Sequence, residues 1–243
     1  MCYFNSLVAP KGATITLSGT TKQLDPTNRP LQSGFSYHNW PIIKGSTQNF
    51  TIENAHWELI APWVKTTQEV QVGREKFNTL NATAERLFES KLFKPAALNN
   101  RCLVLSSGFY EWRHYKPAGA KKEIAYPYFI TLKEQTLFYM AGIYQPWTDK
   151  ETGETMDTFS IVTTKANAFM EQIHNKKKRM PTILTEAQAS EWLNPSLSES
   201  KIMELASSAY DANQLSAYTL DKSFRTASNP MDAFDYPELP GLI

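Results

Sequence analysis

Cysteine is scarce in this sequence, since only Cys2 and Cys102 occur among 243 residues. Two cysteines are too few for a disulfide framework, and no Cys-x-x-Cys spacing is present for zinc. His38, His56 and His114 also lack acidic or sulfur partners at metal-ligand spacing. We therefore expect no metal and no cofactor. Cys102 alternates with apolar neighbours, and we expect it to lie in the core.

Long hydrophobic runs are absent as well. No stretch approaches the length of about eighteen apolar residues that a membrane span requires. The N-terminus has no basic region followed by a long apolar run, which is the pattern of a secretory signal. These absences predict no contact with a membrane and a soluble, cytoplasmic protein, in which thiols stay reduced.

The sequence has no excess of either charge, with 25 Lys and Arg against 24 Asp and Glu and a formal net charge of +1. This balance neither indicates nor excludes nucleic acid, because a binding face needs only local positive charge. Internal repeats, low-complexity tracts and long polar linkers are missing too. We expect a single domain over residues 1–243, present as a monomer.

The middle of the chain holds short segments rich in β-branched and aromatic residues. They are bounded by Gly, Pro, Ser, Asp or Lys, and they predict strands at residues 101–105, 109–112, 126–132, 137–144 and 159–163. The turn residues Ser106, Ser107 and Gly108 predict that the first two of these strands form a hairpin.

Helices are expected to be fewer and shorter. Apolar spacing and capping patterns predict them at residues 83–91 and 167–174, after the capping box that begins at Thr185, and at residues 199–207. The tail after residue 227 reads as an extended, proline-bearing segment. The pattern predicts an α+β fold, with a mostly antiparallel β-sheet or open barrel core and peripheral helices.

The second residue carries the most specific chemistry. An initiator Met before a small residue is normally removed, which would leave Cys2 first in the chain, with an α-amine of pKa ~8 beside a thiol of pKa ~8.5. The amine can condense with an aldehyde to an imine, and the thiol can then close a five-membered thiazolidine ring. Seen in isolation, Cys2 reads more simply as a small apolar residue near a start codon. The chemistry requires that Met1 be lost.

Several separated motifs accompany Cys2. They are Asn81-Ala82-Thr83-Ala84-Glu85, Arg101-Cys102-Leu103-Val104 continuing to Gly108-Phe109-Tyr110-Glu111-Trp112, Ala141-Gly142-Ile143-Tyr144, and Ile173-His174 followed by Arg179-Met180-Pro181. In this order they resemble the SRAP family, the SOS response-associated peptidases, across essentially the whole chain. The GFYEW and IH…RMP elements are fairly specific, and Cys at position two adds to them.

The resemblance implies the single-domain SRAP fold and covalent capture of abasic sites in single-stranded DNA by the N-terminal cysteine. It also implies a peptidase activity proposed to remove the protein's own N-terminal residues. The reading as a capture enzyme includes an abasic-site lyase activity through the imine. The catalytic set carried over by position is Cys2, Asn81, Glu111 and His174.

Each of the last three has a chemical rationale. Burial in an aromatic strand would raise the pKa of Glu111, which could then exchange a proton with the Cys2 amine. His174 suits proton transfer at the sugar ring oxygen, which opens the ring to the aldehyde. Asn81 offers a donor and an acceptor to orient the amine or the adduct. The alternatives are a structural carboxylate, a packed histidine and a helix N-cap.

Candidate DNA contacts surround this set. Arg179 matches a family position, and Lys176, Lys177 and Lys178 precede it, although most lysine runs are solvated loops. Trp63 and Trp112, with Trp40 and Trp57 as further candidates, could stack on bases, whereas core packing is the commoner fate of Trp. Pro41 falls at a family proline position on the same face.

Three positions depart from the family pattern. Tyr3 and Phe4 stand where the family usually has Gly-Arg, and Thr83 stands where it usually has Arg, with Arg86 nearby. These changes remove candidate phosphate ligands, for which the lysines after His174 could compensate. Two alternatives to the capture of abasic DNA remain open. One is an N-terminal-nucleophile peptidase without DNA chemistry, and the other is a non-catalytic single-strand binding module.

Overall fold

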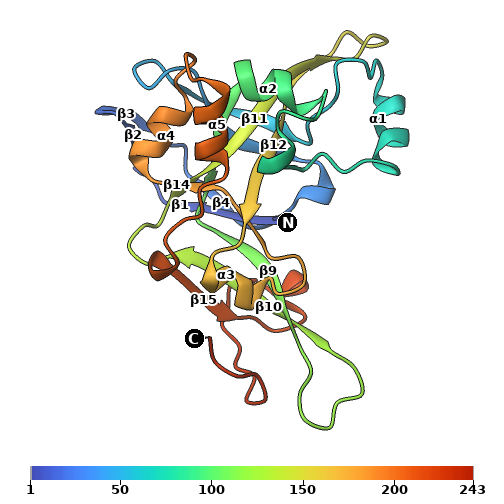
Figure 1. Cartoon of the computed structure of the whole chain (residues 1–243), viewed down its shortest axis with the longest axis vertical. Coiled ribbons are helices and arrows are strands. Elements are labelled where there is room, and N and C mark those ends of the chain that lie inside the picture. The colour runs from blue at the N-terminus through green and yellow to red at the C-terminus, as the bar shows by residue number, and fades with distance from the viewer. Residues whose placement is uncertain (1, 243) are drawn as a thin grey trace.

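The computed structural model describes residues 2–242, which form a strand-rich body with short helices (Figure 1). The strands are β1 (Phe4–Ala9), β2 (Thr14–Leu17), β3 (Thr20–Gln23), β4 (Thr27–Ser33), β5 (Asn39–Lys44), β6 (Thr51–Trp57), β7 (Asn81–Thr83), β8 (Arg101–Ser106), β9 (Gly108–Tyr115), β10 (Ile124–Leu132), β11 (Phe138–Thr148), β12 (Thr155–Lys165), β13 (Arg179–Pro181), β14 (Ile183–Leu184) and β15 (Leu215–Thr219). The helices are α1 (Thr67–Arg74), α2 (Phe93–Asn99), α3 (Ala168–Ile173), α4 (Glu186–Trp192) and α5 (Glu199–Ala206).

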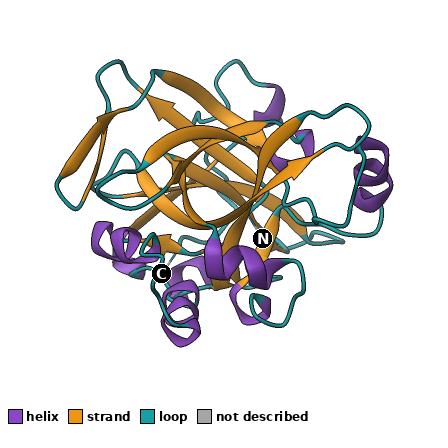
Figure 2. Ribbon diagram, turned by 90° about the horizontal axis from the view of Figure 1, so that it is seen from above, coloured by secondary structure: helices purple, strands orange, loops and turns teal. Residues whose placement is uncertain are grey.

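Two sheets organise the molecule. In the larger, strands β12, β6, β5, β8 and β11 pair in that order, and β11 also pairs with β12, so the hydrogen bonding closes into a barrel. In the second sheet the order is β15-β10-β9-β1-β4. Viewed from above, the strands curve around a common centre and the helices lie outside them (Figure 2). The α+β fold with peripheral helices is therefore confirmed.

Antiparallel pairing prevails, as expected. Among the described strands, only the pairings of β12 with β6 and with β7 are parallel. The barrel interior is filled by large side chains with no exposed surface, among them Trp40, Trp57 and Phe159. The two indole N–H groups donate to the carbonyls of Leu105 and Leu80, so burial of these rings leaves no polar atom unpaired.

Helices at three predicted places are confirmed. Asn167 caps α3 by accepting from the amide of Met170, and Thr185 caps α4 in a capping box with Gln188. Helix α5 also begins where the sequence predicted a helix. In the described part of the chain, no helix is long and apolar enough to cross a membrane, and no cluster of His, Cys, Asp and Glu could hold a metal ion.

The predicted hairpin at residues 106–108 is wrong. Strand β8 belongs to the barrel, whereas β9 belongs to the second sheet, so the chain changes sheets at this turn. The hydroxyl of Ser106 donates to Asn5 Oδ1 at 2.7 Å, and Gly108 lies opposite Ser6 of β1. A Cβ atom at Gly108 would come within 2.2 Å of the Phe129 ring, so glycine permits this close crossing.

The predicted helix at residues 83–91 is wrong as well. Residues Asn81–Thr83 form β7, which pairs in parallel with β12 and is followed by the 3-10 turn Ala84–Arg86. A regular helix begins only at Phe93, with α2. Only Thr83 of the predicted helix pairs with β12, and the residues after it form turns, so the local helical pattern does not prevail; propensity is a weak signal beside tertiary contacts.

Candidate functional site

The neighbouring strands β1 and β9 bring the start of the chain beside Glu111. They pair antiparallel at Asn5 with Phe109, and continuation of this register leads from Phe4 back towards Glu111. The Cys2 side chain is buried, and its thiol donates to the Phe4 carbonyl at 3.8 Å. Burial raises the pKa of the Cys2 thiol above its ordinary value, and the nearby charge of Glu111 raises it further.

Glu111 is the buried carboxyl of this site. It lies in the aromatic segment of β9 and only 3% of its surface is exposed. Burial raises the pKa of Glu111 to about 7, because the charged form is poorly solvated there. A carboxyl with this pKa exchanges protons at neutral pH, which suits general acid–base chemistry.

His174 faces Glu111 from the end of α3. Its Nε2 lies 3.6 Å from Glu111 Oε2, and its Nδ1–H donates to the Arg179 carbonyl at 2.7 Å. Burial lowers the pKa of His174 to about 4, so the imidazole is neutral at neutral pH. The bond to Arg179 places the proton on Nδ1, and Nε2 therefore presents its lone pair towards Glu111.

Asn81 lies on β7, whose pairing partner β12 belongs to the barrel. Its side chain is buried, and neither its amide nitrogen nor its amide oxygen has a hydrogen-bond partner among residues 2–242. An unpaired buried polar group costs about 1–3 kcal/mol, so such groups are rare in native structures. The amide is therefore well suited to bind a polar ligand.

Arg179 holds the histidine segment in place. Its guanidinium donates to the Thr163 carbonyl and to Glu85, each at 2.6 Å, while its own carbonyl accepts from His174. Arg179 Nε is buried without a hydrogen-bond partner among the described atoms. Because Glu85 already pairs with the guanidinium, Arg179 has less unopposed charge to offer a phosphate than the sequence suggested.

The predicted lysines lie on the loop between α3 and β13. Their side chains are exposed, and Lys176 pairs with Glu123 at 2.5 Å. Lys178 has a positive φ of 50° and approaches Glu171 at 3.8 Å. No ion pair involves Lys177 among the described residues. The loop therefore presents positive charge to solvent next to His174.

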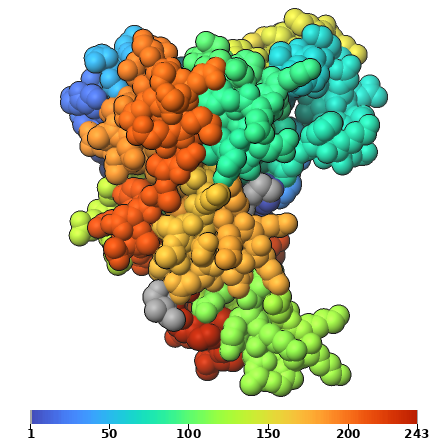
Figure 3. Space-filling model, viewed as in Figure 1, coloured from blue at the N-terminus to red at the C-terminus, as the bar shows by residue number. Residues whose placement is uncertain are grey.

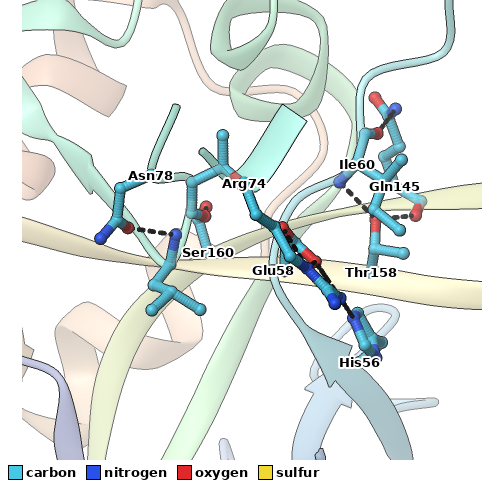
Figure 4. A network of polar contacts seen from close by, with 10 residues as sticks. His56, Glu58, Ile60, Arg74, Asn78, Gln145, Thr158 and Ser160 are labelled. Carbon is cyan, nitrogen blue, oxygen red and sulfur yellow. Dashed lines mark hydrogen bonds and ion pairs between the residues drawn. The ribbon is translucent and has the colours of Figure 1, made fainter. Parts of the chain in front are cut away.

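Trp63 is the exposed tryptophan, with 56% of its surface accessible. It borders a cavity of about 550 Å³ that Arg86, Phe77 and Phe93 also line. Residues that shortly precede Trp63 are held by hydrogen bonds shown in Figure 4: Arg74 donates to Glu58 at 2.7 Å, and the Ile60 amide donates to Thr158 at 3.2 Å. These bonds fix an aromatic ring at the surface, where it can stack on a base.

The other predicted aromatic and proline contacts divide into two groups. Trp112 is half-buried and its ring lies 5.2 Å from that of Phe4. Pro41 is buried in β5, as are Trp40 and Trp57 nearby, so these three offer little surface to a strand. Of the predicted stacking residues, only Trp63 and Trp112 therefore have side chains that are accessible to solvent.

Sequence reasoning missed two side chains at this site. Arg225 is exposed, and its guanidinium lies 5.0 Å from the Phe4 ring and 5.3 Å from the Trp112 ring. Asn175 accepts from the His114 amide at 3.0 Å and donates to the His114 carbonyl at 2.7 Å. No local pattern reveals either, because each partner lies far away in the sequence.

Comparison with known proteins identifies the family of this chain. The family model described as SOS response associated peptidase (SRAP) matches residues 8–226. The abasic site processing protein YoqW of Bacillus subtilis (strain 168) is 35% identical over 188 residues, which cover 77% of each chain. The abasic site processing protein YMR114C of Saccharomyces cerevisiae is 29% identical over 183 residues, 73% of this chain and 45% of that protein.

Solved structures share the fold of this chain. A crystal structure of a protein from Bacteroides thetaiotaomicron superposes with a TM-score of 0.78 at 34% identity, and the match covers 95% of this chain and 97% of that one. A protein from Bordetella bronchiseptica gives a TM-score of 0.66 at 18% identity, which supports the fold alone. Because the family model spans most of the sequence, the chain belongs to the SRAP family.

Proposed function

We propose that this protein processes abasic sites in DNA, and that Cys2, once Met1 is removed, captures the abasic sugar covalently in single-stranded DNA. The observation that carries the proposal is the buried pair of Glu111 and His174, which lies beside the start of the chain. The names of the curated relatives, abasic site processing proteins, support the same substrate. The protein would act as a cytoplasmic monomer.

The proposed reaction needs no oxidant or cofactor. The neutral α-amine of Cys2 attacks the aldehyde carbon of the open sugar, a C–N bond forms, and loss of one water gives an imine. The thiol sulfur then attacks the imine carbon, a C–S bond forms, and the thiol proton passes to the nitrogen. The product is a thiazolidine that joins the first residue to DNA.

Glu111 and His174 would divide the proton transfers between them. With a pKa of about 7, Glu111 accepts a proton from the Cys2 ammonium and returns one when water leaves. The neutral His174, whose Nδ1–H donates to the Arg179 carbonyl, would accept through Nε2 the proton of the sugar's anomeric hydroxyl and pass it to the ring oxygen as the ring opens. Their opposite pKa shifts, one raised and one lowered, suit groups with different roles.

Asn81 would supply the polar contact that the reacting groups need. Its unpaired amide has one face that donates and one that accepts, which fits an amine or a sugar hydroxyl. The DNA strand around the lesion would be contacted by Trp63, Trp112, Arg86, Arg179 and the three lysines. Positive charge at the lysine loop favours the phosphates, and the aromatic rings favour unpaired bases.

The direct test is incubation with an oligonucleotide that carries one abasic site, followed by denaturing electrophoresis. The wild type should give a heat-stable protein–DNA band, and Cys2→Ala should give none. Cys2→Ser, like Cys2→Ala, keeps the amine but loses the thiol, so the imine of either variant should be visible only after borohydride reduction. Cys102→Ala is the matched control and should behave as wild type. A stable band in Cys2→Ala would contradict the proposal.

A peptidase is the second candidate, because the matching family model describes an SOS response associated peptidase. In this role Cys2 would be the nucleophile and Glu111 the base, with the protein's own leader as substrate. Turnover of added peptides without DNA would favour it over covalent capture. An abasic-site lyase would instead leave cleaved DNA, and a simple binding module would leave only reversible, salt-sensitive complexes.

A further inference from the structure

We propose that the tip of the hairpin between β9 and β10, to which the loop at residues 175–178 is bonded, forms a second contact for the phosphates of the DNA strand, away from the reacting sugar. We call the hairpin tip (residues 115–124) and this loop the basic arm. The inference rests on the proposed function for its substrate class, DNA. Its test is chosen to be independent of the covalent step.

The hairpin is a projecting, well-defined structure. Strands β9 and β10 stay in register up to Tyr115 and Ile124, and the turn beyond them contains Gly119 at a φ of 78°. The amide of Ala120 donates to the Pro117 carbonyl at 3.1 Å, which closes the turn. In Figures 1 and 3 the yellow-green tip extends beyond the rest of the body.

The lysine loop is fastened to this hairpin. Asn175 makes both of its hydrogen bonds to the backbone of His114, much as a neighbouring strand would. Lys176 pairs with Glu123, the residue of the hairpin tip that directly precedes β10. The loop and the hairpin tip therefore present their charges from one surface, although about 60 residues separate them in the sequence.

Positive charge on the basic arm is largely unopposed. The exposed residues Lys116, Lys121, Lys122 and Lys177 make no ion pair within the described chain, and Glu123 is occupied by Lys176. The whole protein has a formal net charge of only +1, so this concentration of lysine is local. A local positive surface on a neutral protein attracts a polyanion, and its effect should weaken with salt.

The hairpin tip also lies at a suitable distance from the reacting carboxyl to contact a DNA strand beyond the lesion. Glu111 lies on β9 and Lys116 directly follows its last residue, so the start of the tip lies roughly 17 Å from the reacting carboxyl at about 3.4 Å per residue. A strand held at Cys2 would reach the arm several nucleotides from the lesion. A short oligonucleotide would not reach it.

The test measures equilibrium binding to single strands that carry a reduced abasic analogue, which has no aldehyde and cannot form the imine. One probe has two nucleotides on each side of the analogue and the other has twelve. The variant is Lys116→Gln/Lys121→Gln/Lys122→Gln. The matched control is Lys11→Gln/Lys133→Gln/Lys150→Gln, which removes the same charge from exposed lysines elsewhere.

The arm variant should bind the long probe on the order of tenfold more weakly than the control variant does, and should bind the short probe equally well. Its plot of log affinity against log salt should lose about two units of slope, as expected for three lost contacts at ~0.7 each. Equal affinities and slopes for the two variants would overturn the proposal. Failure of wild type to capture an aldehyde-bearing probe would instead refute the proposed function alone.

Discussion

Burial tunes the two titratable side chains of the site in opposite directions. Both Glu111 and His174 lie out of solvent, which disfavours the charged form of each and so raises one pKa and lowers the other. The sequence predicted the residue types and the raised pKa of Glu111 from its aromatic strand. It did not predict the lowered pKa of His174, because that depends on the packing of α3 against β9.

The pH dependence of capture follows from Glu111. Its ionised form accepts the proton from the Cys2 ammonium, so the rate should rise with pH through about 7. Glu111→Gln should slow adduct formation and remove this inflection, while the rise from the α-amine near ~8 remains. The measurement is the initial rate of adduct formation from pH 5 to pH 9. An unchanged profile would remove the assigned role.

The same shift has a consequence for stability. The folded pKa of Glu111, about 7, lies above its ordinary 4.5, so this group favours folding below 4.5 and loses that contribution as pH rises to 7. His174 acts in the other direction: its contribution is present above 6.5 and is lost as pH falls towards 4. The unfolding temperature of Glu111→Gln minus that of wild type should therefore be greater at pH 8 than at pH 4.

Arg225 supplies a cation next to Phe4, which stands where the family pattern usually has an arginine. Its guanidinium is held by the aromatic faces of Phe4 and Trp112 and has no ion pair in the described chain. Arg225→Gln should weaken binding of abasic single strands several-fold, and Arg225→Lys should recover part of the loss. Exposed Lys222 provides the control, since Lys222→Gln should bind as wild type does.

At the scale of elements, the strands in the middle of the chain were predictable but their pairing was not. Alternating and β-branched residues located β8 to β12, yet the chain switches sheets at residue 107, which neither composition nor turn type reveals. The helix expected at residues 83–91 is absent: Thr83 ends β7, whose partner β12 lies about 80 residues away, and a 3-10 turn follows. Short elements such as α1 carry too weak a periodic signal.

Gly108 tests the crossing between the two sheets. Gly108→Ala would place a methyl group 2.2 Å from the Phe129 ring and 3.0 Å from the Ile130 carbonyl, so it should destabilise the fold by about 1–3 kcal/mol. Gly73→Ala meets no atom within 4 Å and lies in α1, so it should stabilise slightly or be neutral. Urea midpoints measure both, and equal midpoints would refute the close packing.

Asn175 tests the link between the lysine loop and β9. Asn175→Ala removes two hydrogen bonds and should cost about 1–3 kcal/mol in stability. It should also slow capture, because His174 is the adjacent residue. Asn175→Asp keeps the acceptor for the His114 amide and should fall between Ala and wild type. The unfolding temperature and the capture rate are measured on the same samples. If neither changes, the result contradicts the link.

At the scale of the whole molecule, sequence and structure agree on architecture and family. The α+β fold was predictable because strand-forming segments dominate the centre of the chain, and the motifs around Glu111 and His174 indicated the family. The closed barrel and the basic arm were not predictable. Both arise from contacts between distant segments, such as β11 with β12 and Asn175 with His114.

The most direct measurement of the central claim is the intact mass of the purified protein, before and after exposure to single-stranded DNA with one abasic site. The first spectrum should show a chain that lacks Met1. The second should show that chain plus the oligonucleotide minus one water, and this product should be absent with Cys2→Ala. A chain that keeps Met1 and still forms the adduct, or a Met1-free chain that forms none, would contradict the account.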